Sequence, residues 1–136
     1  MPKSTTTAND TLDAFLRAVD PSWRAGATRY IALHTADPAN AGTQLTSEAT
    51  YTGYARVAVT AATGFSAASA GASQNTGLIQ FPQCTGGTNV ITHVSIGTAT
   101  TGAGQIIYRG ALNASLSVAN LIQPQFSIGS LTATEQ

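Results

Sequence analysis

The sequence has 136 residues, no net charge and a single cysteine, Cys84. This length suits one domain with a core of its own, and one cysteine excludes an internal disulfide framework. The first ten residues, MPKSTTTAND, contain no apolar stretch, and no segment approaches the ~18 apolar residues of a membrane span. We therefore expect a protein that is made in a cytoplasm and has no membrane partner.

Charged residues are scarce and unevenly distributed. They make up 9% of the chain, and between Val57 and Ala133 the only formal charge is Arg109. A typical soluble domain carries about a quarter charged residues, and a neutral surface is poorly defended against association. We expect a protein that stays packed against other proteins, the alternative being an ordinary domain with a neutral, Thr-rich surface. The absence of a basic patch or stripe argues against nucleic-acid binding.

The N-terminal region predicts an arm and a helix. Residues 1–9 are polar and predict a flexible arm, and residues 10–19 predict a helix that Asp10 caps and Pro21 stops. The apolar positions have the spacing i, i+3, i+4 and i+7 that places them on one helix face: Leu12, Phe15, Leu16 and Val19. This face must pack either on the protein's own sheet or on a neighbouring chain.

The rest of the chain predicts strands. Short segments of apolar or alternating character are separated by Gly-rich or Pro-containing turns: 29–34, 54–60, 78–81, 90–96, 105–110, 114–118 and 124–130. Residues 64–77 are small and polar and predict a long loop or a weak edge strand. Because no helices alternate with these strands, the pattern indicates an antiparallel sandwich or small barrel rather than a parallel α/β sheet.

One stretch, YIALHTADPANAG at 30–42, places a histidine and an aspartate close together. His34 and Asp37 could share a proton or hold a metal, but the G-x-S-x-G nucleophile elbow is absent, and GFSAA at 64–68 lacks its last glycine. Asp37 followed by Pro38 is a strong turn starter, because the carboxylate bonds backbone amides and proline fixes φ. We interpret the stretch as a strand followed by its exit turn.

Metal and cofactor sites are not expected. His34, His93 and Cys84 are too few for a closed zinc site, and the carboxylates are too scattered for calcium. We expect His93 to be a partly buried structural residue within its strand. The glycine turns lack the lysine and hydroxyl of a P-loop and the G-x-G-x-x-G of a dinucleotide fold. We predict no cofactor and no enzymatic activity.

Four residues are candidates for a protein interface. Phe15 lies on the predicted apolar helix face. Trp23 and Arg24 follow the helix and belong to types favoured at binding hot spots, although Trp23 could equally be a lid over the end of the core. Arg109, the sole charge of the second half, is expected to contact a carbonyl cluster or an acidic group on a partner.

Several stretches occur together in a recognisable order: YIALHTADP (30–38), SEATYTGYARVAV (47–59), ITHVSIG (91–97), GQIIYRGAL (104–112) and FSIGSLTATE (126–135). The series resembles a family of small tailed-phage virion proteins, whose members are often labelled tail fibre proteins. The chain is similar as well to small cement proteins that decorate phage heads. The resemblance implies an all-β antiparallel sandwich, jelly-roll-like, formed by residues 10–136 as a single domain.

Two roles in the particle follow from this resemblance. The first is a cement or decoration protein on the capsid surface, which binds the major capsid protein and itself and stabilises contacts between capsid subunits. The sequence does not distinguish a dimer from a trimer, and a dimer is slightly preferred because two-fold symmetry is the commonest. The alternative is a tail or tail-fibre component involved in host attachment. The compact pattern favours the first, because a receptor-binding fibre usually needs an elongated shaft.

Overall fold

A computed structural model describes residues 1–135 of the chain. It contains one α-helix, α1 (Thr5–Arg17), a short 3-10 helix, η1 (Ser22–Ala25), and eight strands. The strands are β1 (Thr28–His34), β2 (Val57–Thr60), β3 (Ala72–Gln74), β4 (Ile79–Gln80), β5 (Asn89–Gly97), β6 (Ile106–Val118), β7 (Gln125–Phe126) and β8 (Thr132–Thr134). All strand pairings are antiparallel.

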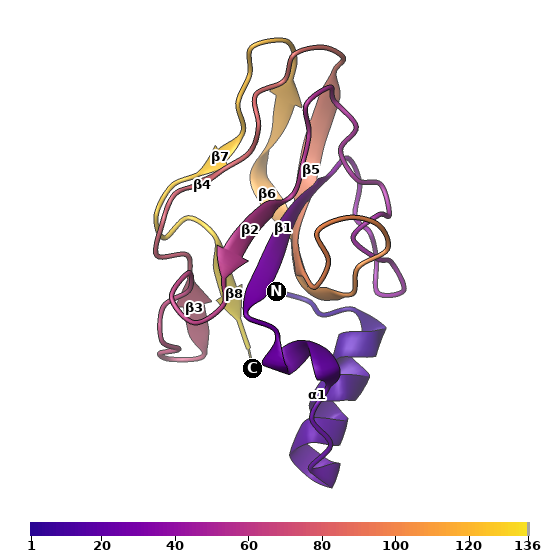
Figure 1. Ribbon diagram of the computed structural model, residues 1–136, viewed down its shortest axis with the longest axis vertical. Coiled ribbons are helices and arrows are strands. Elements are labelled where there is room, and N and C mark those ends of the chain that lie inside the picture. The colour runs from indigo at the N-terminus through magenta and orange to yellow at the C-terminus, as the bar shows by residue number, and fades with distance from the viewer. Residues whose placement is uncertain (136) are drawn as a thin grey trace.

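The strands form one larger sheet and two ribbons. The four-stranded sheet has the order β2-β1-β5-β6, and the ribbons are β3-β8 and β4-β7. Figure 1 shows the two ribbons along one side of the sheet, with α1 projecting below both. The predicted all-β, sandwich-like fold with one N-terminal helix is confirmed. The jelly-roll order is not confirmed, since a jelly roll has eight strands divided between two sheets.

The core lies between the sheet and the β4-β7 ribbon. In β1, Ile31 pairs with Ile96 and Leu33 with Val94, and all four side chains are buried. Against them pack residues from the ribbon and the loops, including Tyr51, Ile79, Phe81, Cys84 and Leu131. Each fully buried aliphatic or aromatic side chain contributes about 1.5–3 kcal/mol.

Four consecutive buried residues end β1, from Ile31 to His34, so both faces of this strand are covered there. The loop that follows folds back over the second face. In that loop the buried Gln44 donates from Nε2 to the Tyr30 carbonyl at 2.9 Å and accepts from the Ala99 amide at 3.1 Å. This packing explains why the apolar run of β1 is continuous rather than alternating.

The helix prediction needs correction at its start. The helix begins at Thr5 instead of residue 10, because the Ser4 side chain accepts from the Thr7 amide at 3.2 Å and so caps it. Asp10 is consequently an internal helix residue rather than the cap. The first four residues of the predicted arm, 1–9, pack against the body of the protein: the Pro2 carbonyl accepts from the Arg109 amide at 2.9 Å, and Ser4 is buried.

Two further differences concern the strands. Segments 105–110 and 114–118 were expected as separate strands but form one long strand, β6, which is in register with β5 apart from local shifts. The ribbon β3-β8 arises in a segment expected as a long loop or a weak edge strand, and in the polar tail. This ribbon brings the two ends of the chain close together, since the N-terminal amine of Met1 donates to the carbonyl of Thr134 in β8 at 3.1 Å.

Candidate interaction surface

Helix α1 contacts the body of the protein through polar side chains. Thr7 Oγ1 donates to the Ile106 carbonyl at 2.6 Å, and Ser4 Oγ donates to the same carbonyl at 2.7 Å. The carboxylate of Asp10 accepts from Trp23 Nε1 at 2.7 Å and from Gln105 Nε2 at 2.8 Å. Thr7 is the only buried residue of the helix. The inner face of α1 is therefore a hydrogen-bonded polar face.

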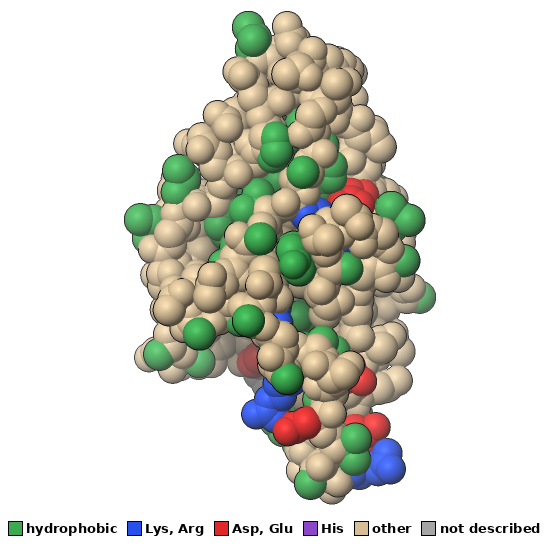
Figure 2. Space-filling model, in the orientation of Figure 1, with side chains coloured by type: hydrophobic (Ala, Val, Ile, Leu, Met, Phe, Trp, Pro, Cys, Tyr) green, Lys and Arg blue, Asp and Glu red, His purple; other side chains and the backbone are tan. Residues whose placement is uncertain are grey.

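The apolar face of α1 points away from the body. We define the outward face as Leu12, Phe15 and Leu16 of α1 together with Val19, which follows the helix end at Arg17. The exposed fractions of these four large apolar side chains are 57, 80, 79 and 50%. In Figure 2 hydrophobic and charged side chains gather at the lower end of the molecule, where α1 projects. An ordinary surface helix turns its apolar stripe to the core. The helix α1 is thus oriented with the usual polarity reversed.

The sequence left two alternatives open for this helix face, and the protein's own sheet does not cover it. Phe15, a predicted interface residue, is the most exposed large apolar side chain of the molecule's described part, residues 1–135. Sequence reasoning omitted Leu12, Leu16 and Val19 from the candidate interface. The signal was present, because Thr7, Asp10 and Thr11 form an opposite face polar enough to bond to a sheet edge.

Trp23 and Arg24, two other predicted interface residues, lie in η1 beside α1. Trp23 is half-buried, bonds to Asp10, and has the Arg29 guanidinium 5.7 Å from its ring centroid. It therefore fastens η1 to α1. Arg24 is exposed and pairs with the exposed Asp20. Whether either residue contacts a partner stays a prediction.

Arg109 lies inside the chain, with 8% of its surface exposed. Its Nη1 donates to Asp37 Oδ1 at 2.5 Å and its Nη2 to Asn40 Oδ1 at 2.5 Å, while its Nε is buried without a partner. The acidic group expected on a partner is thus found in the same chain. The guanidinium ties the loop after β1 to strand β6.

The His34–Asp37 stretch is structural in its geometry. His34 is fully buried, with Nδ1 2.8 Å from the Thr46 carbonyl and Nε2 2.8 Å from Ser95 Oγ. Because a carbonyl only accepts, Nδ1 carries the proton and Nε2 accepts from Ser95. Asp37 accepts from the Ala39 amide at 2.9 Å, the expected turn. The structure does not bring these two side chains into one site.

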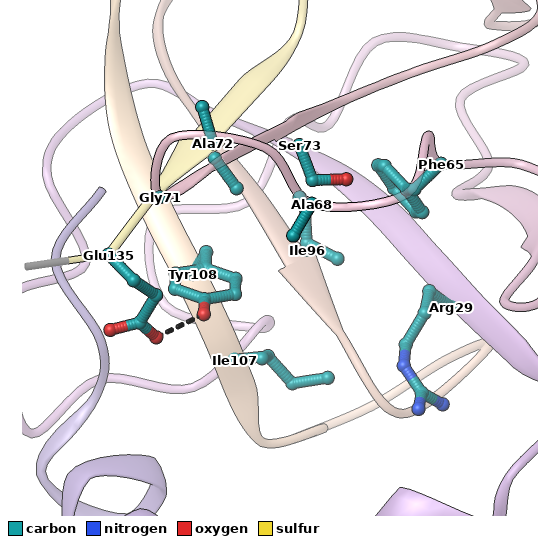
Figure 3. Close-up of a pocket in the computed structure, with 11 residues that line it drawn as sticks. Arg29, Phe65, Ala68, Gly71, Ala72, Ser73, Ile96, Ile107, Tyr108 and Glu135 are labelled. Atoms are coloured by element: carbon teal, nitrogen blue, oxygen red, sulfur yellow. Dashed lines mark hydrogen bonds between the residues drawn. The ribbon is translucent and has the colours of Figure 1, made fainter.

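An apolar cavity of about 250 Å³ lies between the sheet and the β3-β8 ribbon. Its walls include Phe65, Ile96 and Ile107. Figure 3 shows the Glu135 carboxylate bonded to the Tyr108 hydroxyl, with Arg29 on the opposite side of the cavity. Burial, together with this bond, raises the pKa of Tyr108 well above its usual value, so the phenol stays protonated.

A second cavity of about 260 Å³ lies between α1, η1 and β6, and it shares Ile107, Tyr108 and Glu135 with the first. Its walls include Ala14, Phe15 and Trp23. The ion pair between Lys3 and Glu135, at 2.7 Å, belongs to the same region. Phe15 of the outward face lines the second cavity, whereas no residue of α1 lines the first.

The described residues, 1–135, hold no cluster of three or more metal-ligating side chains. Within the same range, no helix is long and apolar enough to cross a bilayer. The hydroxyl of Ser73, at the first cavity, donates to the Ser66 carbonyl at 2.8 Å rather than to a base.

The fold and this surface define a class of protein: a small antiparallel β protein with an exposed apolar helix face. A family described as "Podophage GP4 fiber I protein gp80" matches residues 2–134, and the chain belongs to this family of bacteriophage virion proteins. The resemblance seen in the sequence is confirmed at this level. No curated protein matches the chain.

Proposed function

We propose that the protein is a structural subunit of a phage fibre or tail and that it is built into the particle through the outward face of α1. The observation that carries this proposal is the reversed polarity of α1, whose polar side is bonded to β6 while Phe15 and Leu16 stay about four-fifths exposed. The description of the family, which names a fibre protein, supports the fibre over other locations.

The exposed apolar side chains of the outward face gain free energy when a partner buries them. Burying a large aliphatic or aromatic side chain stabilises a complex by about 1.5–3 kcal/mol before association costs are subtracted. In a monomer these four side chains stay in water and contribute none of this free energy. Contiguous exposed patches of this kind mark interaction sites. The helix therefore serves assembly rather than the stability of the free subunit.

A second candidate is the capsid decoration protein favoured by the sequence. Two observations support it: residues 57–133 carry one charge, and the fold is compact, without a shaft. In that role many copies would bind the major capsid protein on the outer capsid surface, and repetition would supply avidity. The two candidates differ in copy number and in position on the particle.

Quantitative mass spectrometry of purified virions, combined with immunogold electron microscopy, distinguishes them. A fibre or tail subunit is expected in a small number of copies at one vertex. Labelling over the whole head, with hundreds of copies per particle, would contradict the fibre subunit and support the decoration protein. Absence of the protein from virions would refute both candidates.

The role of the helix is tested in the phage itself. Virions made with Leu16→Asp are expected to lack the protein, whereas Ile128→Asp, at a similarly exposed apolar position outside α1, should leave incorporation unchanged. Normal incorporation of the Leu16→Asp variant would show that α1 is not the attachment surface.

A further inference from the structure

We infer that the apolar cavity between the sheet and the β3-β8 ribbon binds a small organic acid with one carboxylate and an apolar body. Arg29 holds the carboxylate, and the body fills the cavity. This site is separate from the outward face of α1, and the inference goes beyond the proposed function, because it holds wherever the protein lies in the particle.

Arg29 differs from the other basic side chains in its lack of an acidic partner. Within the described residues, 1–135, no carboxylate pairs with it. Burial lowers the pKa of the Arg29 guanidinium, because the positive charge has lost part of its hydration. A bound anion would therefore meet a charge that nothing else compensates. Each of the other five basic side chains forms an ion pair: Lys3–Glu135, Arg17–Asp13, Arg24–Asp20, Arg56–Glu48 and Arg109–Asp37.

The Arg29 guanidinium is held in place through Nη1 and through its face. Nη1 donates to the carbonyl of Gly26 at 3.0 Å and to the carbonyl of Thr28 at 3.1 Å. The guanidinium carbon lies 5.7 Å from the centroid of the Trp23 ring, a cation–π contact. These contacts position the group before any ligand arrives, which lowers the entropy lost when a ligand binds.

The opposite edge of the guanidinium, formed by Nε and Nη2, is unused by the described residues. This edge is a planar fork of two donors that matches the two oxygens of a carboxylate. Arg56 of the same chain binds Glu48 in this way, with Nε 2.6 Å from Oε1 and Nη2 2.8 Å from Oε2. At Arg29 the same fork is left for a carboxylate that does not belong to residues 1–135.

The cavity beside Arg29 determines the size and character of the ligand body. Its volume is about 250 Å³, and its walls include Phe65, Ala68, Ile96 and Ile107. An apolar cavity of roughly 150 Å³ binds benzene, so in proportion this one accommodates a ligand of about ten non-hydrogen atoms. Arene or alkyl groups of monocarboxylic acids such as phenylacetate and octanoate have this size and polarity.

The far wall of the cavity orients the ligand. Figure 3 shows Tyr108 and Glu135 on one side of the cavity and Arg29 on the other. The Glu135 carboxylate is already paired with Lys3 at 2.7 Å and bonded to the Tyr108 hydroxyl, so it needs no further cation. It would repel a second carboxylate on a ligand. The ligand therefore carries one charge, at Arg29, and turns its apolar end toward Tyr108.

The first experiment is an NMR titration of the ¹⁵N-labelled full-length protein with phenylacetate and, separately, with octanoate, in a buffer free of other carboxylates. For ligands of this size we expect a Kd of roughly 1 mM or tighter. Saturable shifts are expected for the Arg29 Nε–H signal and for the amides of Ala72 and Ile107, which line the cavity. If neither acid shifts these signals up to roughly ten times that Kd, or if the shifts centre on Phe15 and Leu16 instead, the inference is wrong.

The second experiment tests the charge of the ligand with the wild-type protein alone. Phenylacetamide has nearly the same shape as phenylacetate but no charge, and it should bind about tenfold more weakly. The Arg29→Gln variant should lose this preference and bind the acid and the amide alike. Equal affinities of the wild type for the acid and the amide would overturn the role of Arg29 even if the variant does not fold.

The third experiment blocks the cavity. Ala68 lines it, whereas the neighbouring Ala67 does not, and both are exposed. Ala68→Phe should fill the cavity and weaken phenylacetate binding at least about tenfold, and the control Ala67→Phe should leave it unchanged. Wild-type affinity of the Ala68→Phe variant would show that the ligand body lies outside the cavity and would refute the inference. None of these variants alters α1, so the outcome is independent of how the protein is attached to the particle.

Discussion

The carboxylate of Asp37 accepts a hydrogen bond from the guanidinium of Arg109, 72 residues later in the chain. This pair joins the exit turn of β1 to β6, across the edge of the sheet where Pro2 runs alongside. Arg109 is 8% exposed, so its charge has left water, and Asp37 and Asn40 supply the compensation. The single arginine of the second half of the sequence thus holds a loop from the first half in place.

The first prediction removes one side of this pair. Asp37→Asn leaves a buried guanidinium without its carboxylate and should lower the free energy of unfolding by about 1–2 kcal/mol, measured by urea unfolding at pH 7.5. The matched control is Asp20→Asn, since Asp20 pairs with Arg24 on the surface and both side chains are mostly exposed. The control should change stability by less than about 0.5 kcal/mol. Equal effects of the two substitutions would contradict a structural role for the buried pair.

The second prediction concerns the pH dependence of stability through His34. Burial lowers the pKa of His34, so the imidazole is neutral in the folded protein, whereas an unfolded chain titrates it near the usual value of about 6.5. Below that pH the unfolded state binds one more proton than the folded state. Stability should therefore fall between pH 7 and pH 5 by up to about 1.4 kcal/mol per pH unit.

Urea unfolding at three pH values in this window checks the slope. The variant His34→Asn keeps a donor near the Thr46 carbonyl and should be less stable at pH 7.5 but nearly independent of pH down to 5. Asp37 and Glu135 affect stability at lower pH. Hydrogen bonds lower the pKa of Asp37. Burial raises the pKa of Glu135, but its hydrogen bonds with Lys3 and Tyr108 lower it, and the net shift is downward. Their contribution is lost only as the pH falls below about 4. If the unfolding free energy of the His34→Asn variant falls with pH as steeply as that of the wild type, groups other than His34 cause the acid sensitivity.

The strands of the central sheet and of the β4-β7 ribbon could be predicted from sequence, whereas the β3-β8 ribbon could not be predicted as a pair. In β1 and β5 the apolar residues are dense enough to identify a strand before its partner is known. The ribbon β3-β8 consists of small polar residues, and only the pairing of Ser73 with Ala133, 60 residues apart by the register, makes them strands. Long-range pairing of this kind leaves no local signal.

The candidate interaction surface was likewise predictable from sequence only in part. The period of the apolar residues in α1 identified the face that includes Phe15, but no local pattern states which side of a helix meets the sheet. That choice depends on the Ile106 carbonyl, which Ser4 and Thr7 both contact from about 100 residues away. Arg109 was singled out correctly as unusual, but its partner Asp37 is distant in sequence, so an intermolecular contact was the available interpretation.

The third prediction tests the packing of the loop over β1. A Cβ placed on Gly97 would lie 2.1 Å from Gln44 Cδ, and the backbone there needs no special conformation, so the effect of Gly97→Ala is steric. This substitution should cost about 1–3 kcal/mol by overpacking. In the Gln44→Ala background the same substitution should cost much less, because its obstacle is gone. Gly77→Ala, where nothing lies within 4 Å, is the matched control. Additive effects of Gly97→Ala and Gln44→Ala in a double-mutant cycle would refute the contact.

The fourth prediction links the helix cap to assembly. Ser4 Oγ accepts from the Thr7 amide and donates to the Ile106 carbonyl, so one hydroxyl both caps α1 and fastens it to β6. Ser4→Ala should lower the unfolding free energy by about 1–2 kcal/mol. It should also weaken incorporation into virions, because a helix that is free to move must be ordered again when its partner in the particle binds. Thr6→Ala, at an exposed position in the same turn, should change neither quantity. Thermal unfolding of the purified protein and quantitative mass spectrometry of virions separate the two effects. A loss of stability with unchanged incorporation would mean that the position of α1 on β6 does not matter for assembly.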